Sequence, residues 1–148
     1  MRALVGLALA SVLVSCAAPP KPTSVALGEA CWRCKRPINN DRIAAEQVGP
    51  NGLAAKFRTI HCMSTWLAQQ PKAPEGWLYV ANYERGGWIR ADRASYVRVI
   101  VDRNTMERDF IAFSDTGRAA EAARTNNSTV VDWKGVLDLG RTQPIGGD

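Results

Sequence analysis

The chain has 148 residues, a net charge of +5 at pH 7 and four cysteines. This length suits one compact domain or two very small ones. The basic residues are scattered and are not interleaved with aromatic residues, which argues against a nucleic-acid-binding surface. We expect this excess of basic residues to form a solvated surface; the alternative, a docking face, would suit an acidic partner.

Residues 1–15 have the pattern of a bacterial lipoprotein signal. Met1 and Arg2 precede the apolar run "ALVGLALASVLV", which is too short for a permanent membrane span and is followed by Ser15 and Cys16. We expect cleavage after Ser15 and lipid modification of Cys16. An ordinary secretory signal is the alternative. Ala17 favours the outer membrane, so we expect a protein anchored on the periplasmic side of a Gram-negative envelope.

The residues that follow predict a tether, one folded region and a tail. The segment "AAPPKPTSVALGEA" is rich in proline and alanine and lacks apolar periodicity, so residues 16–30 are expected to be a lipid-anchored tether. The folded domain is expected over 31–140. The final stretch "RTQPIGGD" predicts a flexible tail over 141–148.

The first half of the domain predicts a strand, a helix and a strand. The helix has Met63, Trp66 and Leu67 on one face and ends before Pro71. Alternation of side chains predicts the strand that follows it. The predicted ranges are 53–57 for the first strand, 62–70 for the helix and 76–84 for the second strand.

The second half repeats this order after a joint at Gly86-Gly87. Its predicted strands are 96–102, 109–113 and 128–133, with a helix over 115–124 capped by Ser114. The fold class predicted is therefore α+β, with two similar halves at about 31–85 and 86–140. Each half is expected to be an antiparallel sheet with one helix.

The cysteine count indicates chemistry. With Cys16 lipidated, Cys31, Cys34 and Cys62 remain. An odd number of thiols in an oxidising compartment leaves at least one of them free or bound to a ligand.

The stretch "CWRC" allows several kinds of site. A redox pair at Cys31 and Cys34 would need a preceding strand and a following helix, but a polar tether precedes the pair and Pro37 follows it. A structural zinc site would need His61 and Cys62 as well, but these residues are adjacent and their side chains are expected to point in different directions. Both interpretations stay open beside a sulfur site for a soft metal.

Other sulfur groups support the soft-metal interpretation. Cys62 lies at the start of the predicted helix, where the helix dipole favours a thiolate. Met106, in the polar turn "DRNTMERD", is either a scattered exposed residue or a thioether ligand. Thiolate and thioether ligands together select Cu(I), whereas metals that prefer oxygen ligands would need a carboxylate cluster.

The chain resembles the NosL family, the accessory lipoproteins of nitrous-oxide reductase. The pieces that carry the resemblance are the lipobox, the short tether with Cys-x-x-Cys, "KFRTIHCMSTWL", "YVANYERGGWIRADRASYVRV" and "TMERDFIAFSDTGRAAEAA". They span roughly residues 13–135, and their order and spacing carry more weight than any one of them. The chain departs from the family at Lys35-Arg36, where Gly-Met commonly follows the cysteine.

The resemblance implies a small α+β lipoprotein, related in fold to a domain of organomercurial lyases, that binds Cu(I) and is not an enzyme. Its ligands would be Cys31, Cys34 and Met106, with Cys62 or His61 completing the site. It would deliver copper by ligand exchange to a periplasmic enzyme such as nitrous-oxide reductase. The alternatives are a periplasmic thiol-disulfide protein that uses Cys31 and Cys34, and a structural lipoprotein that docks a partner.

Overall fold

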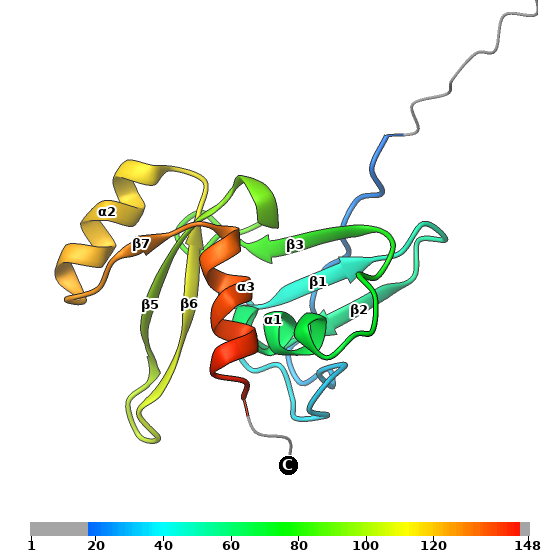
Figure 1. Cartoon of the computed structure of the whole chain (residues 1–148), viewed down its shortest axis with the longest axis horizontal. Helices are drawn as coiled ribbons and strands as arrows, with labels where there is room; N and C mark the ends of the chain where they lie inside the picture. The colour runs from blue at the N-terminus through cyan, green and yellow to red at the C-terminus, as the bar shows by residue number, and fades with distance from the viewer. Residues whose placement is uncertain (1–17, 146–148) are drawn as a thin grey trace, which may run out of the picture.

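A computed structural model describes residues 18–145 and shows two antiparallel sheets with three helices (Figure 1). The predicted α+β class is therefore confirmed. The first sheet has the strand order β2-β1-β3-β4, and the second has the order β6-β5-β7. The strands are β1 (Ala45–Val48), β2 (Ala54–Phe57), β3 (Trp77–Ala81), β4 (Trp88–Arg90), β5 (Ser95–Asp102), β6 (Glu107–Phe113) and β7 (Val130–Val131).

The helices are α1 (Ile60–Ala68), α2 (Thr116–Thr125) and α3 (Trp133–Thr142), with a short 3₁₀ turn η1 (Ala91–Arg93). Helix α1 packs on the first sheet and against α3, while α3 also contacts β5 and β7 of the second sheet, and α2 covers that second sheet (Figure 1). The two sheets meet where Tyr83 N donates to the Ala112 carbonyl at 2.9 Å. Within the described range, no helix is long and apolar enough to cross a membrane.

Helix α1 begins two residues earlier than the sequence predicted. Thr59 has extended backbone angles, and its side-chain oxygen accepts the Cys62 N–H at 3.1 Å, so Thr59 is the N-cap. This places Cys62 within the first turn of the helix. Helix α2 is capped by Asp115, whose carboxylate accepts the Arg118 N–H at 3.0 Å, and not by the predicted Ser114.

Helix α3 was not predicted from the sequence. The sequence predicted a strand over 128–133 and a tail from 141, but the strand is only β7 and the helix runs to Thr142. Asp132 caps the helix by accepting the Gly135 N–H at 2.9 Å. Gly140 permits its close crossing with α1, because a Cβ there would lie 2.6 Å from the Ser64 carbonyl carbon. These glycines made the segment look non-helical in sequence.

Strands β1 and β4 were also missed. Strand β1 reads "AEQV", and alanine, glutamate and glutamine carry little strand propensity. Its position is decided by pairing with β2 on one side and β3 on the other. Strand β4 has three residues, too few for a periodic signal, and it pairs with β3.

The predicted tether is packed against the first sheet from residue 20 onward. Glu46, Lys56 and Tyr79 are register neighbours on one face of this sheet, opposite the helices. The buried Glu46 carboxylate accepts the N–H and the hydroxyl of Thr23, while Tyr79 donates to the Pro20 carbonyl at 2.8 Å. These polar side chains bind the backbone of the segment, and this is a tertiary effect that composition does not report. Cys16 and the signal segment lie outside the described residues.

Candidate metal centre

The Cys-x-x-Cys segment is a closed loop beside strand β2. The N–H of Cys31 donates to the Arg36 carbonyl at 2.9 Å, and the N–H of Lys35 donates back to the Cys31 carbonyl at 3.0 Å. Trp32 N binds the Lys56 carbonyl at 2.7 Å, which attaches the loop to the edge of the sheet. Lys35 turns the chain with a φ of 59°, a left-handed conformation that few residue types adopt readily.

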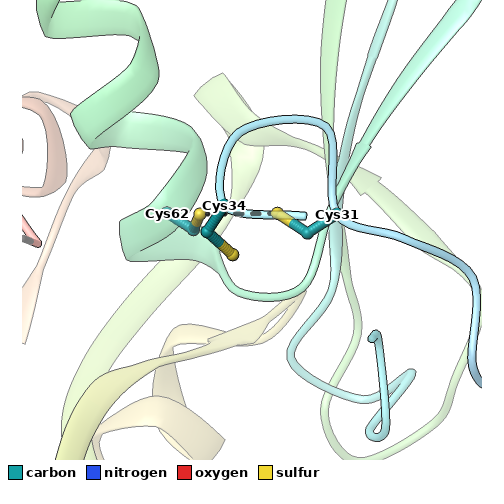
Figure 2. Close-up of side chains that lie close together, drawn as sticks. All are labelled: Cys31, Cys34 and Cys62. Carbon is teal, nitrogen blue, oxygen red and sulfur yellow. Dashed lines mark hydrogen bonds between the residues drawn. The ribbon is translucent and has the colours of Figure 1, made fainter. Parts of the chain in front are cut away.

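This loop lies against the start of helix α1, so three thiols converge. Cys31 and Cys34 come from the loop and Cys62 comes from the first turn of α1 (Figure 2). Their sulfur atoms all lie within 4.8 Å of one another, and the Cys31 and Cys62 sulfurs are 3.5 Å apart. All three are free thiols. The sequence predicted Cys62 only as a residue that completes the site, because it is distant from the loop cysteines in the chain and no local pattern places it beside them.

The cluster is largely withdrawn from solvent. Cys31 is 0% exposed and Cys62 is 1% exposed, whereas Cys34 is half-buried. Phe57, Ile60 and Met63 belong to the same buried cluster as the two deep thiols. A soft, polarisable ligand set in apolar surroundings favours a soft ion of low charge over a strongly hydrated one.

Electrostatics favour one thiolate at Cys31. The Cys31 and Cys62 sulfurs share a hydrogen bond, and this bond lowers the pKa of the Cys31 thiol. Burial opposes this effect, while the backbone N–H groups of Cys34, Arg58 and Arg33 reinforce it. The same hydrogen bond raises the pKa of Cys62, and burial raises it further. The Cys31–Cys62 pair therefore loses its first proton readily and its second only at high pH, unless a bound cation displaces the second proton.

The sulfur spacing suits a single ion bound by all three thiols. For metal–sulfur bonds of about 2.3 Å, three sulfurs in a trigonal arrangement lie roughly 4 Å apart. The separations in this cluster need only small adjustments to reach that value. Among residues 18–145, no carboxylate or imidazole joins the group, which leaves an all-sulfur site.

His61 lies on α1 next to Cys62 but faces a different part of the molecule. Its Nε2 atom lies 2.9 Å from the Gln143 carbonyl, and its ring makes an edge contact with Phe110 at 6.2 Å between centroids. Burial lowers the pKa of His61. Successive helix residues point in directions about 100° apart, so the two neighbours diverge as the sequence predicted.

Met106 lies at the turn between β5 and β6. Its side chain is 61% exposed and its φ is 58°. It borders a hollow of about 320 Å³ together with three arginines, Arg98, Arg103 and Arg108. The structure thus brings Cys31, Cys34 and Cys62 together, and it places His61 and Met106 in other surroundings.

The end of the chain joins the two segments that carry the thiols. The Ile145 N–H donates to Thr65 Oγ1 on α1 at 3.2 Å, and the Ile145 carbonyl accepts from Arg33 Nη2 in the loop at 2.7 Å. Arg33, Thr65 and Ile145 were not predicted to support the site, because nothing in the local sequence indicates that the chain returns to it. Residues 143–145 therefore connect the loop to the helix.

Comparisons of the chain with protein-family models, curated proteins and solved structures gave no match. The assignment of a function therefore depends on the chemistry of the three-cysteine cluster and on the sequence motifs.

Proposed function

We propose that the protein binds Cu(I) at Cys31, Cys34 and Cys62 and passes it to another protein as a lipid-anchored, non-enzymatic accessory factor. The observation that carries this proposal is the convergence of three free thiols within 4.8 Å, two of them buried. The resemblance to the NosL family supports copper as the cargo. It also supports the periplasmic side of the envelope as the location and an enzyme such as nitrous-oxide reductase as the recipient.

The composition of the site favours Cu(I) over zinc. Structural zinc is nearly always bound by four ligands, and this cluster offers three. Cu(I) accepts low coordination by thiolates, and thioether groups are ligands that it tolerates. Met106 remains a predicted ligand, which would have to reach the ion through movement of its turn or through contact with another chain.

Transfer by ligand exchange fits the uneven exposure of the thiols. Cys31 and Cys62 would retain the ion while Cys34, which borders solvent, exchanges with an incoming ligand. The ion keeps its charge throughout, so the protein needs no redox partner for this step.

Anaerobic titration of the reduced protein with Cu(I), in the presence of a competing chelator, tests this proposal. We expect one ion per chain and an affinity at least tenfold lower in Cys62→Ser, because the helix ligand is then missing. The matched control is Met63→Leu, which changes a buried sulfur outside the three-thiol group and should leave the affinity unchanged. Wild-type binding no tighter than that of a Cys31→Ala/Cys34→Ala variant would contradict the proposal.

A thiol-disulfide function is the second candidate. It is favoured by the lowered pKa of Cys31 and by the 3.5 Å separation of the Cys31 and Cys62 sulfurs. Against it, both of these sulfurs are buried, and a substrate disulfide would have to approach through Cys34. Mass spectrometry of the protein as isolated, with a count of bound metal and free thiols, separates a metal site from a disulfide.

A further inference from the structure

The exposed side of the Cys-x-x-Cys loop is the route by which a ligand can reach the cluster. Cys31 and Cys62 are 0% and 1% exposed, so an incoming sulfur cannot contact them without a change in the fold. Cys34 is half-buried and borders solvent. Ligand exchange therefore starts at Cys34, and the residues around it select what can approach.

The surroundings of Cys34 are cationic and aromatic. The loop residues 32–36 read "WRCKR". Arg33 turns inward, since its Nη2 donates to the Ile145 carbonyl and its Nε and Nη1 atoms are buried, so Lys35 is the neighbour of Cys34 that presents an exposed cation. Trp32 is 54% exposed, which is unusual for so large an apolar side chain. Lys35 places its ammonium 5.1 Å from the centre of the Trp32 ring and donates to the Trp32 carbonyl at 2.7 Å. The cation is thereby held beside the exposed ring.

Glu29, an acid close to the loop in sequence, is already engaged. It pairs with Lys56 at 3.0 Å and accepts the Ala26 N–H at 3.2 Å. A cationic surface raises the local concentration of anionic partners and repels cationic ones. An exposed tryptophan such as Trp32 is the type of residue that anchors protein interfaces.

We propose that Trp32, Cys34 and Lys35 form a docking surface for an acidic protein, whose thiolate or thioether takes the metal from Cys34. This inference rests on the proposed function for its metal step, while the surface itself is testable without metal. In that step the partner's sulfur binds Cu(I) as the Cys34 sulfur releases it. No electron is exchanged, and the ion remains Cu(I).

The first experiment uses the metal-free, reduced protein and two disulfide reagents. The dianionic reagent 5,5′-dithiobis(2-nitrobenzoate) and the neutral reagent 4,4′-dithiodipyridine both report thiol reaction by absorbance. Peptide mapping should identify Cys34 as the first residue modified. Lys35→Asp should lower the ratio of the anionic rate to the neutral rate about fivefold or more at low salt. Aspartate suits this position because it tolerates a positive φ.

The matched control is Lys72→Asp, which makes the same charge change at an exposed lysine beyond the far end of α1. It should leave the rate ratio unchanged. High salt should remove the difference between wild type and Lys35→Asp. A first reaction at Cys31 or Cys62, or a ratio that Lys35→Asp and Lys72→Asp lower equally, would overturn the docking surface.

The second experiment measures Cu(I) transfer from the loaded protein to two synthetic peptides. Both peptides carry the same Cys-x-x-Cys pair, one flanked by glutamates and the other by lysines. Transfer to the acidic peptide should be faster, and Lys35→Asp should reverse or abolish this preference. Equal rates in the wild type would overturn the inference. So would Trp32-dependent binding to phosphatidylglycerol vesicles without any preference between the peptides, because it would assign the surface to lipid.

The two proposals fail separately. If the protein binds no Cu(I), the proposed function fails, and the reagent experiment still decides whether the surface selects anions at Cys34. If Cu(I) binds but neither the reagents nor the peptides distinguish charge, the docking surface fails and the metal site stands.

Discussion

Met106 combines an unfavourable backbone conformation with an exposed thioether side chain. Its φ of 58° lies in the left-handed region, and its side chain is 61% exposed. This conformation costs a residue other than glycine roughly 1–2 kcal/mol. An apolar, strained and exposed residue gains little for the fold itself, so the thioether is the feature of interest.

We expect Met106→Gly to raise the free energy of unfolding by about 1 kcal/mol, because glycine adopts a positive φ without a steric penalty. Urea denaturation of the metal-free protein measures this. Cu(I) titration of the same variant then tests the predicted ligand. An unchanged affinity would remove Met106 from the ligand set, and a drop of tenfold or more would retain it.

Asp109 is the buried acid behind the start of α1. It is 0% exposed, and its Oδ1 atom accepts the N–H groups of His61 and Phe110. Its other oxygen has no hydrogen-bond partner among the described residues. Burial raises the pKa of Asp109 from 3.8 to about 6, and the hydrogen bonds that it accepts oppose the shift.

The raised pKa of Asp109 predicts a pH-dependent stability. Between pH 3.8 and about 6 the folded state keeps a proton that the unfolded state has lost, so stability falls as the pH rises through this window. Asp109→Asn should remove this dependence. The free energy of unfolding of Asp109→Asn, measured relative to that of the wild type, should therefore rise by up to about 3 kcal/mol between pH 4 and pH 7. A difference that is constant across this range, measured by urea denaturation, would contradict the prediction.

At the level of elements, the cluster depends on three segments that are distant in sequence. The loop is attached to β2 through Trp32, α1 begins at a cap provided by Thr59, and residues 143–145 connect loop and helix. The Thr59 cap fixes where the first turn of α1 starts, and this position brings the Cys62 sulfur next to the loop cysteines. A helix beginning at Cys62, as the sequence predicted, would lack this turn.

Removal of residues 143–148 should weaken metal binding. The truncation deletes three hydrogen bonds: Ile145 N–H to Thr65, Arg33 to the Ile145 carbonyl, and the one between His61 Nε2 and the Gln143 carbonyl. Each such bond contributes about 1 kcal/mol, so we expect a loss of roughly 3 kcal/mol in stability and a several-fold lower affinity for Cu(I). Truncation after Ile145 is the control and should keep both properties. Equal affinity in the two truncated chains would show that the connection does not support the site.

At the level of the whole molecule, the site lies where the N-terminal segment, the edge of the first sheet, α1 and the end of the chain meet. A metal bound there links the loop to the helix. Cys31 and Cys34 are close in any conformation of the chain, whereas Cys62 joins them only after folding. Metal binding to all three thiols is therefore coupled to folding.

This coupling predicts that Cu(I) stabilises the wild type more than Cys62→Ser. With free Cu(I) about a thousandfold above its dissociation constant, the wild type should gain about 4 kcal/mol, less whatever the unfolded chain binds. In Cys62→Ser the remaining pair binds the ion in folded and unfolded chains alike, so the gain should be small. Thermal unfolding with and without buffered Cu(I) measures both, and equal gains would contradict a three-thiol site.

The sequence by itself determined the α+β class and most of the strands, and it indicated a candidate site made of cysteine sulfurs. Side-chain alternation identified β3, strands were also predicted where β2, β5 and β6 lie, and the apolar stripe identified α1. These signals are local, so they are readable from neighbouring residues. The odd number of thiols that remains once Cys16 is set aside likewise indicated a free or metal-bound cysteine.

Only the tertiary structure decided which sulfurs meet. Cys62 joins the loop because Thr59 caps α1 and because Trp32 pairs with β2, and these contacts connect residues far apart in the chain. The packing of the tether on Glu46 and the crossing of α3 at Gly140 were hidden for the same reason. Composition describes a segment in isolation, whereas the position of these segments depends on partners that the local sequence does not contain.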